Sequence, residues 1–325
     1  MQPGTYLDHA VSRVPLAGHV GKSGARLERV RLADGRRLVV KRLDPSSDLI
    51  MALSEDTAGR ELQVWRAGLL DRLPEGVGHA VVDGWRDDGG AVLVMRDLGG
   101  SVLTWDDRLT GPRWRFVLER VAALHRAFLG HAPEGLTPLH SCLGLFSPAR
   151  VRPHLGDDNQ LPPLVLRGWE RFEQTVPKDV AEPALGLLDD LRPLERALAA
   201  RPATLVHGDL ATVNMALEGP QLTLLDWSMP TAAPGAMDLA RFVAGCSSVV
   251  DGTREELLEG YRLAAGEAYD GPALDLALLA ALLWLGWNKA LDATEHPDPV
   301  VRAREREDLR WWVDRTRRAL EAGLL

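Results

Sequence analysis

Two short segments near the middle of the chain limit most strictly what it can fold into. The first, at 205–214, is Leu-Val-His-Gly-Asp-Leu-Ala-Thr-Val-Asn, and the second, at 222–227, is Leu-Thr-Leu-Leu-Asp-Trp. They supply carboxylates at Asp209 and Asp226 and an amide at Asn214. In phosphoryl transfer, one carboxylate accepts or orients a hydroxyl proton, while an amide oxygen and another carboxylate hold magnesium. The pattern therefore predicts a loop that folds back into one cleft suited to magnesium-assisted phosphoryl transfer.

Lysine is scarce in this chain, since only four of its 38 basic residues are lysines. Of these, only Lys41 lies in an apolar, strand-like run. That run, 37–43, follows a similar stretch at 27–32 across Asp34-Gly35, which is a strong hairpin signal. Alternation places Lys41 on the face opposite Leu38 and Val40. We therefore expect its compact ammonium to face a cleft, where it could bind a phosphate.

A glycine-rich turn precedes this hairpin at 18–24 and includes Gly21 and Gly24. Its backbone could approach phosphates closely. A Walker phosphate loop does not fit, because Leu16 stands where that motif needs glycine and the turn runs into a strand rather than a helix. Two interpretations remain, a glycine-rich lid between antiparallel strands and a plain flexible turn.

The segment 54–70 has helical periodicity, with Ser54 as a possible N-cap and two acids in the expected first turn. Glu61 then falls in the middle of this helix, beside its apolar face. Two roles are open for it. It is either a solvated helix acid or the partner of an ion pair that holds Lys41 in position.

The β-rich part of the chain is predicted to end soon after two further strands, at 80–85 and 91–95. A glycine pair follows, and we place a lobe boundary near 96–101. The backbone beside this boundary, at Met95 and Asp97, is available to an adenine ring.

The remainder of the chain is predicted to be mostly helical. The long segment 132–163 is rich in proline and glycine and is expected to be a functional loop with short turns. His125 is expected to be a satisfied core histidine, and the charged residues of the last helix to form a solvated face. The predicted helices are 112–129, 164–174, 184–200, 273–291 and 302–322.

Length and composition bound the class of protein. A chain of 325 residues is either one two-lobed catalytic unit or two domains. A net charge of -8 gives no sign of a nucleic-acid surface. We find no signal peptide, and the longest apolar run, 276–287, is too short to span a bilayer, so a cytoplasmic location is the default expectation. Cys142 and Cys246 are expected to be small buried hydrophobic residues.

Taken together, these motifs resemble the aminoglycoside phosphotransferase and choline kinase-like family, a branch of the protein-kinase-like fold. The resemblance covers about residues 14–245. It is carried by Lys41 in Val-Val-Lys, by Glu61, by His207-Gly208-Asp209-x4-Asn214 and by Asp226-Trp227-Ser228. It implies an α+β, bilobal fold, with a small antiparallel β-rich lobe that has one main helix, and a larger, mostly helical lobe.

The resemblance implies a nucleotide-binding lobe at 1–97 and a helical lobe at 98–325, with inserted substrate-binding helices at 105–200. It also implies the roles of single residues. Asp209 would be the catalytic base, Asn214 and Asp226 the magnesium ligands, and Lys41 the phosphate ligand with Glu61 as its partner.

Two further residues take supporting roles by the same resemblance. His207 would pack the catalytic loop, and Asp238 would brace it, although Asp238 could also be a simple helix N-cap. The implied cofactors are Mg²⁺ and ATP, with GTP possible. The nucleotide would contact Lys41 and Glu61, the glycines of the turn, and the segment that holds Met95 and Asp97.

Features around the motif argue against a protein substrate. Gly208 stands where the protein-kinase motif has arginine, and only eleven residues separate Asp226 from Asp238, which leaves little room for a regulated activation segment. We therefore expect an O-phosphotransferase that acts on a hydroxyl of a small molecule. An aminoglycoside-like antibiotic, an amino sugar, a sugar and an amino alcohol all remain open, as do the oligomeric state and the position of the hydroxyl.

Several side chains could bind a cationic acceptor, although acids of this kind are commonly solvated loop residues. Tryptophans could stack on a sugar or a cation, although core packing is favoured for Trp284 and Trp287. The acids are Asp106, Asp107, Asp157, Asp158, Glu170 and Glu173, and the tryptophans are Trp169, Trp284 and Trp287.

Two alternative functions are weighed against this one. A catalytically weak or inactive kinase-like nucleotide-binding protein would be expected to lack at least one of the motif residues, and all of them are present. A metal-dependent hydrolase would need more histidines and would leave Lys41 without a role.

Overall fold

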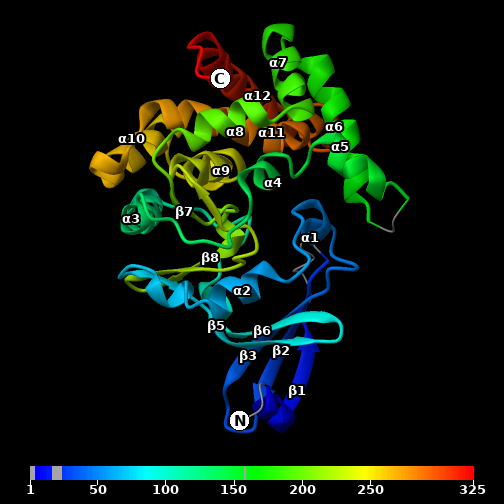
Figure 1. Cartoon of the computed structure of the whole chain (residues 1–325), viewed down its shortest axis with the longest axis vertical. Coiled ribbons are helices and arrows are strands. Elements are labelled where there is room, and N and C mark those ends of the chain that lie inside the picture. The colour runs from blue at the N-terminus through cyan, green and yellow to red at the C-terminus, as the bar shows by residue number, and fades with distance from the viewer. Residues whose placement is uncertain (1–3, 17–23, 157–158) are drawn as a thin grey trace.

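A computed structural model describes residues 4–16, 24–156 and 159–325. The N-terminal part is built on a five-stranded antiparallel sheet at one end of the molecule (Figure 1), in the order β1-β2-β3-β6-β5. Its strands are β1 Ala10–Pro15, β2 Arg26–Leu32, β3 Arg37–Leu43, β5 Val81–Asp87 and β6 Gly90–Arg96. The rest is mostly helical, so the α+β fold class is confirmed.

The predicted hairpin joins β2 to β3. Gly35 takes a φ of 87°, and the Asp34 side chain accepts a hydrogen bond from the Arg36 N–H at 3.0 Å. Residue alternation along β3 follows the prediction, because Leu38 and Val40 belong to a small apolar cluster while Lys41 is buried on the other face. The central position of β3 between β2 and β6 holds that lysine in a fixed register.

The predicted helix from Ser54 is wrong at its start. A short helix, α1 Leu49–Leu53, ends there, and α2 spans Arg60–Arg66. Glu55 between them has a φ of 58° and Gly59 a φ of 71°, which no helix accommodates. The Asp56 carboxylate instead accepts a hydrogen bond from the first amide of α2 at 2.7 Å. Glu61 therefore lies in the first turn of α2. Helix α2 itself lies between the sheet and the helical part (Figure 1).

Two small sheets connect the parts of the chain. In one, β9 (Gln221–Leu224) pairs with β8 (Met215–Glu218) and, in parallel, with β4 (Val77–His79). In the other, β7 (Thr204–Val206) pairs with β10 (Thr231–Ala233). Strand β4, which falls in the segment 1–97, thus completes a sheet whose other strands belong to the C-terminal part.

The helices of the C-terminal part lie in the upper half of Figure 1, and the main apolar core runs from them into β3, α2 and β6 of the N-terminal part. These helices are α3 Gly111–Phe128, α4 Leu139–Leu143, α5 Pro148–Val151, α6 Leu161–Thr175, α7 Lys178–Asp189, α8 Arg192–Ala199, α9 Ala236–Cys246, α10 Arg254–Ala265, α11 Gly271–Glu295 and α12 Pro299–Glu321. Short 3₁₀ turns occur at Thr5–His9, Leu70–Arg72, Gly99–Ser101, Arg152–His154, Thr212–Asn214, Ser247–Val249 and Gly266–Ala268.

One predicted helix is wrong in its extent. The segment 184–200 is divided between α7 and α8, because the chain is extended at Asp190, whose side chain accepts a hydrogen bond from the Arg192 N–H at 3.1 Å. In the described residues of the expected loop at 132–163, only the short helices α4 and α5 and one 3₁₀ turn precede the start of α6 at Leu161.

Helix α11 is the centre of the C-terminal core. By length and composition it could cross a membrane, but 83% of its most apolar window is buried inside the protein. Its Lys289 is also buried, and the ammonium lies 2.6 Å from Glu305 and 2.9 Å from Asp308 of α12. The expectation that the charged residues of this helix form a solvated face is therefore wrong for Glu305 and Asp308, which are buried. Cys142 and Cys246 are free and buried, which confirms their expected character.

Candidate active site

Three charged side chains from distant parts of the chain meet between the sheet and the helical part. Lys41 comes from β3, Glu61 from the first turn of α2, and Asp226 from the segment after β9. The Lys41 Nζ lies 2.7 Å from Glu61 Oε2 and 2.7 Å from Asp226 Oδ1. Lys41 and Glu61 are buried, whereas 36% of the Asp226 side chain is exposed. Of the two roles left open for Glu61, the structure shows the ion pair.

The two carboxylates decide the charge of this lysine. Burial alone would lower the pKa of Lys41, but Asp226 and Glu61 outweigh that effect and raise it. Burial raises the pKa of Glu61 in spite of the neighbouring ammonium. Burial also acts to raise the pKa of Asp226, yet the Lys41 charge prevails and holds it below its ordinary value. Lys41 and Asp226 are therefore both charged at neutral pH.

The loop after β7 presents Asp209 with both carboxylate oxygens engaged. Asn214 Nδ2 donates to the Asp209 backbone oxygen at 2.9 Å and to Oδ2 at 3.0 Å. Arg241, on α9, donates through Nε to Oδ1 at 2.9 Å. The five-residue spacing thus brings Asp209 and Asn214 together, as predicted. Arg241 was missed in the sequence, because nothing in its spacing from Asp209 marks it.

Asp238, in the first turn of α9, braces the backbone of the same loop. Its oxygens accept hydrogen bonds from the His207 N–H at 2.7 Å and the Gly208 N–H at 2.9 Å, and one lies 3.1 Å from His125 Nε2. Burial would raise the pKa of Asp238, but these hydrogen bonds and the nearby histidines hold it below its ordinary value. The N-cap of α9 is Gly235, so the alternative that Asp238 is a simple N-cap is wrong.

Two more contacts fix the loop. The His207 ring is fully buried, lies 4.8 Å from the Trp227 ring and places Nε2 2.8 Å from the Leu225 carbonyl oxygen. Gly208 has a φ of 85°, and a Cβ atom there would lie only 1.9 Å from the Met229 carbonyl oxygen. No larger residue fits at this position without moving the loop.

The two predicted magnesium ligands flank one end of the β8–β9 hairpin. The Leu225 N–H donates to the Asn214 carbonyl oxygen at 2.9 Å, and Asp226 follows directly, with a φ of 59°. Because Asn214 Nδ2 points to Asp209, its amide oxygen is turned elsewhere. An amide oxygen and a partly exposed carboxylate are ligands that magnesium accepts. The residues therefore fit the metal that the sequence predicts.

A family model described as the phosphotransferase enzyme family matches residues 21–276. The chain belongs to this family. Three solved structures also share the fold of this phosphotransferase. The choline kinase LicA from Streptococcus pneumoniae has a TM-score of 0.55 and 12% identity, with 94% of each chain covered. An ethanolamine kinase from Plasmodium vivax has a TM-score of 0.54 and 12% identity, with 94% of this chain and 82% of that chain covered.

The third structure is the aminoglycoside phosphotransferase APH(3'')-Id from Streptomyces rimosus, in complex with ADP and streptomycin. It has a TM-score of 0.50 and 17% identity, with 81% of this chain and 94% of that chain covered. No curated protein matches this phosphotransferase. The family makes it an enzyme, and the low identities limit these likenesses to the fold.

The predicted nucleotide-binding residues of this phosphotransferase have different surroundings. Gly21 lies outside the described residues, while Gly24 has a φ of 93°. Met95 is paired on both sides, with Val39 and Val81, so it lies inside the sheet. Asp97 lies just beyond the sheet, and its buried side chain binds Arg29 at 2.9 Å. The Asp97 N–H donates to the Arg37 carbonyl oxygen at 3.2 Å, and a backbone contact with an adenine ring stays a prediction.

The tryptophans and acids considered for the acceptor have mixed outcomes. Trp169 is buried, and its Nε1 donates to the Phe146 carbonyl oxygen at 2.8 Å, so it offers no open stacking surface. Trp284 and Trp287 pack against the Phe146 ring, as the favoured core interpretation predicts. Among the acids, Asp157 and Asp158 lie outside the described residues, Asp107 is half-buried, and Asp106, Glu170 and Glu173 are exposed.

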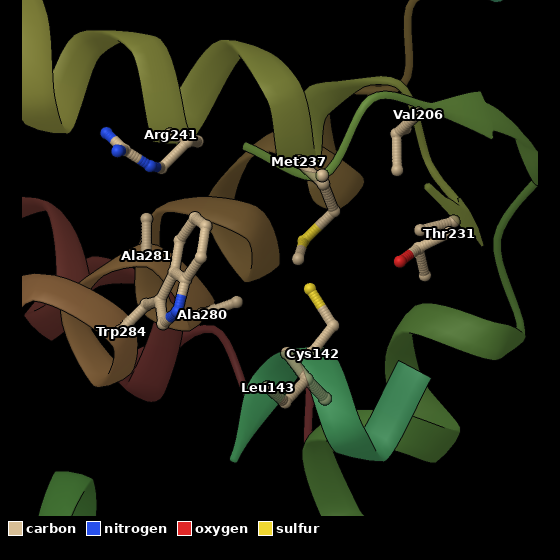
Figure 2. Close-up of a pocket in the computed structure, with 11 residues that line it drawn as sticks. Cys142, Leu143, Val206, Thr231, Met237, Arg241, Ala280, Ala281 and Trp284 are labelled. Atoms are coloured by element: carbon tan, nitrogen blue, oxygen red, sulfur yellow. The ribbon is translucent and has the colours of Figure 1, made fainter. Parts of the chain in front are cut away.

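A small, mostly apolar cavity of about 20 Å³ lies beside the loop 205–214, because Val206 and Gly208 line it. Figure 2 shows Cys142 of α4 and Met237 of α9 with their sulfur atoms pointing toward each other across it. Arg241 of α9 and Trp284 of α11 form another part of its wall. This space has room for about one water molecule and is too small for an acceptor.

Proposed function

We propose that this protein is an ATP-dependent and Mg²⁺-dependent O-phosphotransferase that acts on a hydroxyl of a small molecule. One observation carries the proposal. Lys41 is ion-paired with Asp226, and Leu225, next to Asp226, donates a hydrogen bond to Asn214 of the loop that holds Asp209. GTP is an alternative donor. In this proposal, residues 1–97 contribute the nucleotide site and the helices of 105–200 the acceptor site.

Each side chain has a defined task in the transfer. Lys41 would bind phosphate oxygens of the donor, and Glu61 keeps its ammonium in place from the buried side. Asn214 and Asp226 would hold magnesium, which when bound neutralises charge on the phosphates. Asp209 orients the acceptor hydroxyl and takes its proton as the new O–P bond forms and the bond from the γ-phosphorus to ADP breaks.

The acceptor class is a small hydroxylated compound, such as an aminoglycoside-like antibiotic, an amino sugar, a sugar or an amino alcohol. The shared fold with a choline kinase, an ethanolamine kinase and an aminoglycoside phosphotransferase supports this range. Gly208 supports a small acceptor as well, because the loop has no room for the arginine with which protein kinases bind a phosphorylated activation segment.

The test is a panel of hydroxyl compounds assayed for ADP release with Mg²⁺ and ATP, with GTP in parallel. We expect turnover on one chemical class, its loss on chelation of magnesium, and a loss of kcat in Asp209→Ala with nucleotide affinity nearly unchanged. If no compound is phosphorylated and no nucleotide binds, the proposal is wrong. If Asp209→Ala abolishes nucleotide binding but retains kcat, the role given to Asp209 is wrong.

A further inference from the structure

Arg241 ties the side chain of Asp209 to helix α9. Its Nε and Nη2 atoms lie 2.9 Å and 2.8 Å from the same oxygen, Asp209 Oδ1. Asp238, one turn earlier on α9, already binds the backbone of the catalytic loop at His207 and Gly208. Residues three apart share one face of a helix. One face of α9 therefore holds both the backbone of this loop and its carboxylate.

The guanidinium itself is fixed in place. It lies 5.0 Å from the centre of the Trp284 ring, and only 11% of the Arg241 side chain is exposed. Figure 2 shows the arginine beside Trp284, with α9 above and α11 below. Such stacking on an aromatic face restricts the guanidinium to one plane. Arg241 therefore meets Asp209 as a rigid group rather than as a mobile surface arginine.

Two locally unfavourable features accompany this arrangement. Gly245 lies inside α9, and a Cβ atom there would come within 2.2 Å of Arg241 Nη1. Glycine within a helix is destabilising relative to alanine. In addition, Arg241 Nη1 is buried and has no hydrogen-bond partner among the described residues. The fold thus accepts a helical glycine and an unpaired N–H group where the guanidinium reaches Asp209.

The two oxygens of Asp209 are consequently distinct. Oδ1 is held by Arg241, while Oδ2 receives one hydrogen bond from Asn214 at 3.0 Å. The loop residues between Asp209 and Asn214 are Leu-Ala-Thr-Val, none of which is charged. No cation within the loop itself could take the place of Arg241.

We propose that Arg241 is a positioning residue for the transfer. It fixes the plane of the Asp209 carboxylate, so that Oδ2 is the oxygen that accepts the hydrogen bond, and then the proton, of the acceptor hydroxyl. This inference rests on the proposed function. Because the guanidinium contacts neither donor nor acceptor in this role, its loss should lower kcat and leave nucleotide affinity and the KM for the acceptor nearly unchanged.

The test compares Arg241→Met, Arg241→Lys and a matched control, Arg262→Met, which removes an exposed arginine paired with Glu259 on α10. Methionine keeps an unbranched chain over Trp284 without charge. We expect Arg241→Met to lose about 100-fold in kcat, the scale of a small misplacement of a catalytic group. Arg241→Lys should recover only part of it, because an ammonium cannot make the forked contact. Nucleotide affinity and thermal midpoint show whether each variant is folded.

A second measurement separates positioning from a general structural role. In Arg241→Ala, millimolar guanidinium should restore part of kcat, and it should restore nothing in Asp209→Ala. If folded Arg241→Met keeps kcat within threefold of the parent protein, or if its nucleotide affinity falls as far as its kcat, the proposal is overturned. Absence of rescue, with kcat low, also counts against it.

A double-mutant cycle on the free energy of unfolding tests the contact between Arg241 and Asp209 without any substrate. Arg241→Met and Asp209→Ala should be non-additive in the free energy of unfolding, because they remove the same pair. Additivity would refute the contact even if the enzyme is active. If the coupling is present but no acceptor is phosphorylated, then the proposed function fails, and the catalytic role of Arg241 fails with it.

Discussion

Gly208 offers the sharpest test of how the catalytic loop is held. A Cβ atom at this position would lie 1.9 Å from the Met229 carbonyl oxygen, and the φ of 85° is strained for any residue with a side chain. The left-handed conformation costs about 1–2 kcal/mol. Relief of the overlap requires a backbone shift, and comparable overpacking costs about 1–3 kcal/mol. We therefore expect Gly208→Ala to lower the free energy of unfolding by about 2–5 kcal/mol.

A matched variant separates the two contributions. Gly219, in the turn between β8 and β9, has a φ of 63° and no atom within 4 Å of the Cβ position. Gly219→Ala should therefore show only the backbone cost, about 1–2 kcal/mol. The difference between the two variants, measured by urea unfolding with unchanged slopes, reports the overlap at Gly208. The kcat of Gly208→Ala should also fall, about 100-fold for a shift of 1 Å, while that of Gly219→Ala stays near the parent value.

The reasoning fails if the two alanine variants lose equal stability. In that case the loop yields to the added methyl group at no extra cost, and the hydrogen bonds from Asp238 do not hold it rigidly. It also fails if Gly208→Ala is strongly destabilised but retains full kcat.

Three further predictions concern other buried or strained groups. Burial raises the pKa of Asp48 to about 6, so the folded state binds the proton more tightly than the unfolded state, whose pKa is near 3.8. Stability from this group is present below pH 4 and is lost as the pH rises to 6. Asp48→Asn should therefore stabilise the protein at pH 8 by about 1–3 kcal/mol and have no effect at pH 3.5, measured by urea unfolding. Glu55→Ala should cost about 1 kcal/mol, because it loses the 2.6 Å hydrogen bond from Ser141, and Glu55→Gly should cost less, since glycine tolerates the φ of 58°; equal losses would contradict this. Lys289→Met should lower the free energy of unfolding by about 1.5–3 kcal/mol, the scale of a hydrogen bond to a charged group, because Glu305 and Asp308 lose the ammonium and keep Arg304 and Arg254 as partners; an unchanged stability would show that these arginines replace the ammonium fully.

Local periodicity in the sequence was sufficient where one strand or one loop decides the geometry. The alternation of β3 placed Lys41 on the face opposite Leu38, and the spacing of Asp209 and Asn214 brought them together. Both depend on neighbours within a few residues. The start of α2 was predicted wrongly, because Ser54 and the acids after it imitate an N-cap and a first turn. Glu55 instead contacts Ser141 of α4, a tertiary interaction that local signals do not contain.

The sequence patterns could not predict ion pairs between side chains on separate secondary-structure elements. The pattern of charged residues in α12, taken alone, indicates a solvated face. Only the packing of α11 against α12 shows that Lys289 forms ion pairs with Glu305 and Asp308. Arg241 is similar, because α9 must lie under the catalytic loop before its guanidinium can reach Asp209. Such side chains have no characteristic spacing, so a single sequence cannot distinguish them from surface residues.

The two carboxylates of the proposed site differ in how firmly their cations are held. Asp226 pairs with Lys41, and 36% of its side chain is exposed. Asp209 pairs with Arg241, which is stacked on Trp284 and held by α9. A metal that binds Asp226 would take over part of the charge balance that Lys41 now supplies, which would free the ammonium for phosphate. The ion pair between Arg241 and Asp209 is not expected to change in this way, because no metal ion is predicted to bind Asp209 Oδ1. We therefore expect nucleotide binding to lengthen the contact between Lys41 and Asp226 and to leave the contact between Arg241 and Asp209 unchanged, and a crystal structure with magnesium and a non-hydrolysable ATP analogue that shows the reverse would contradict this division.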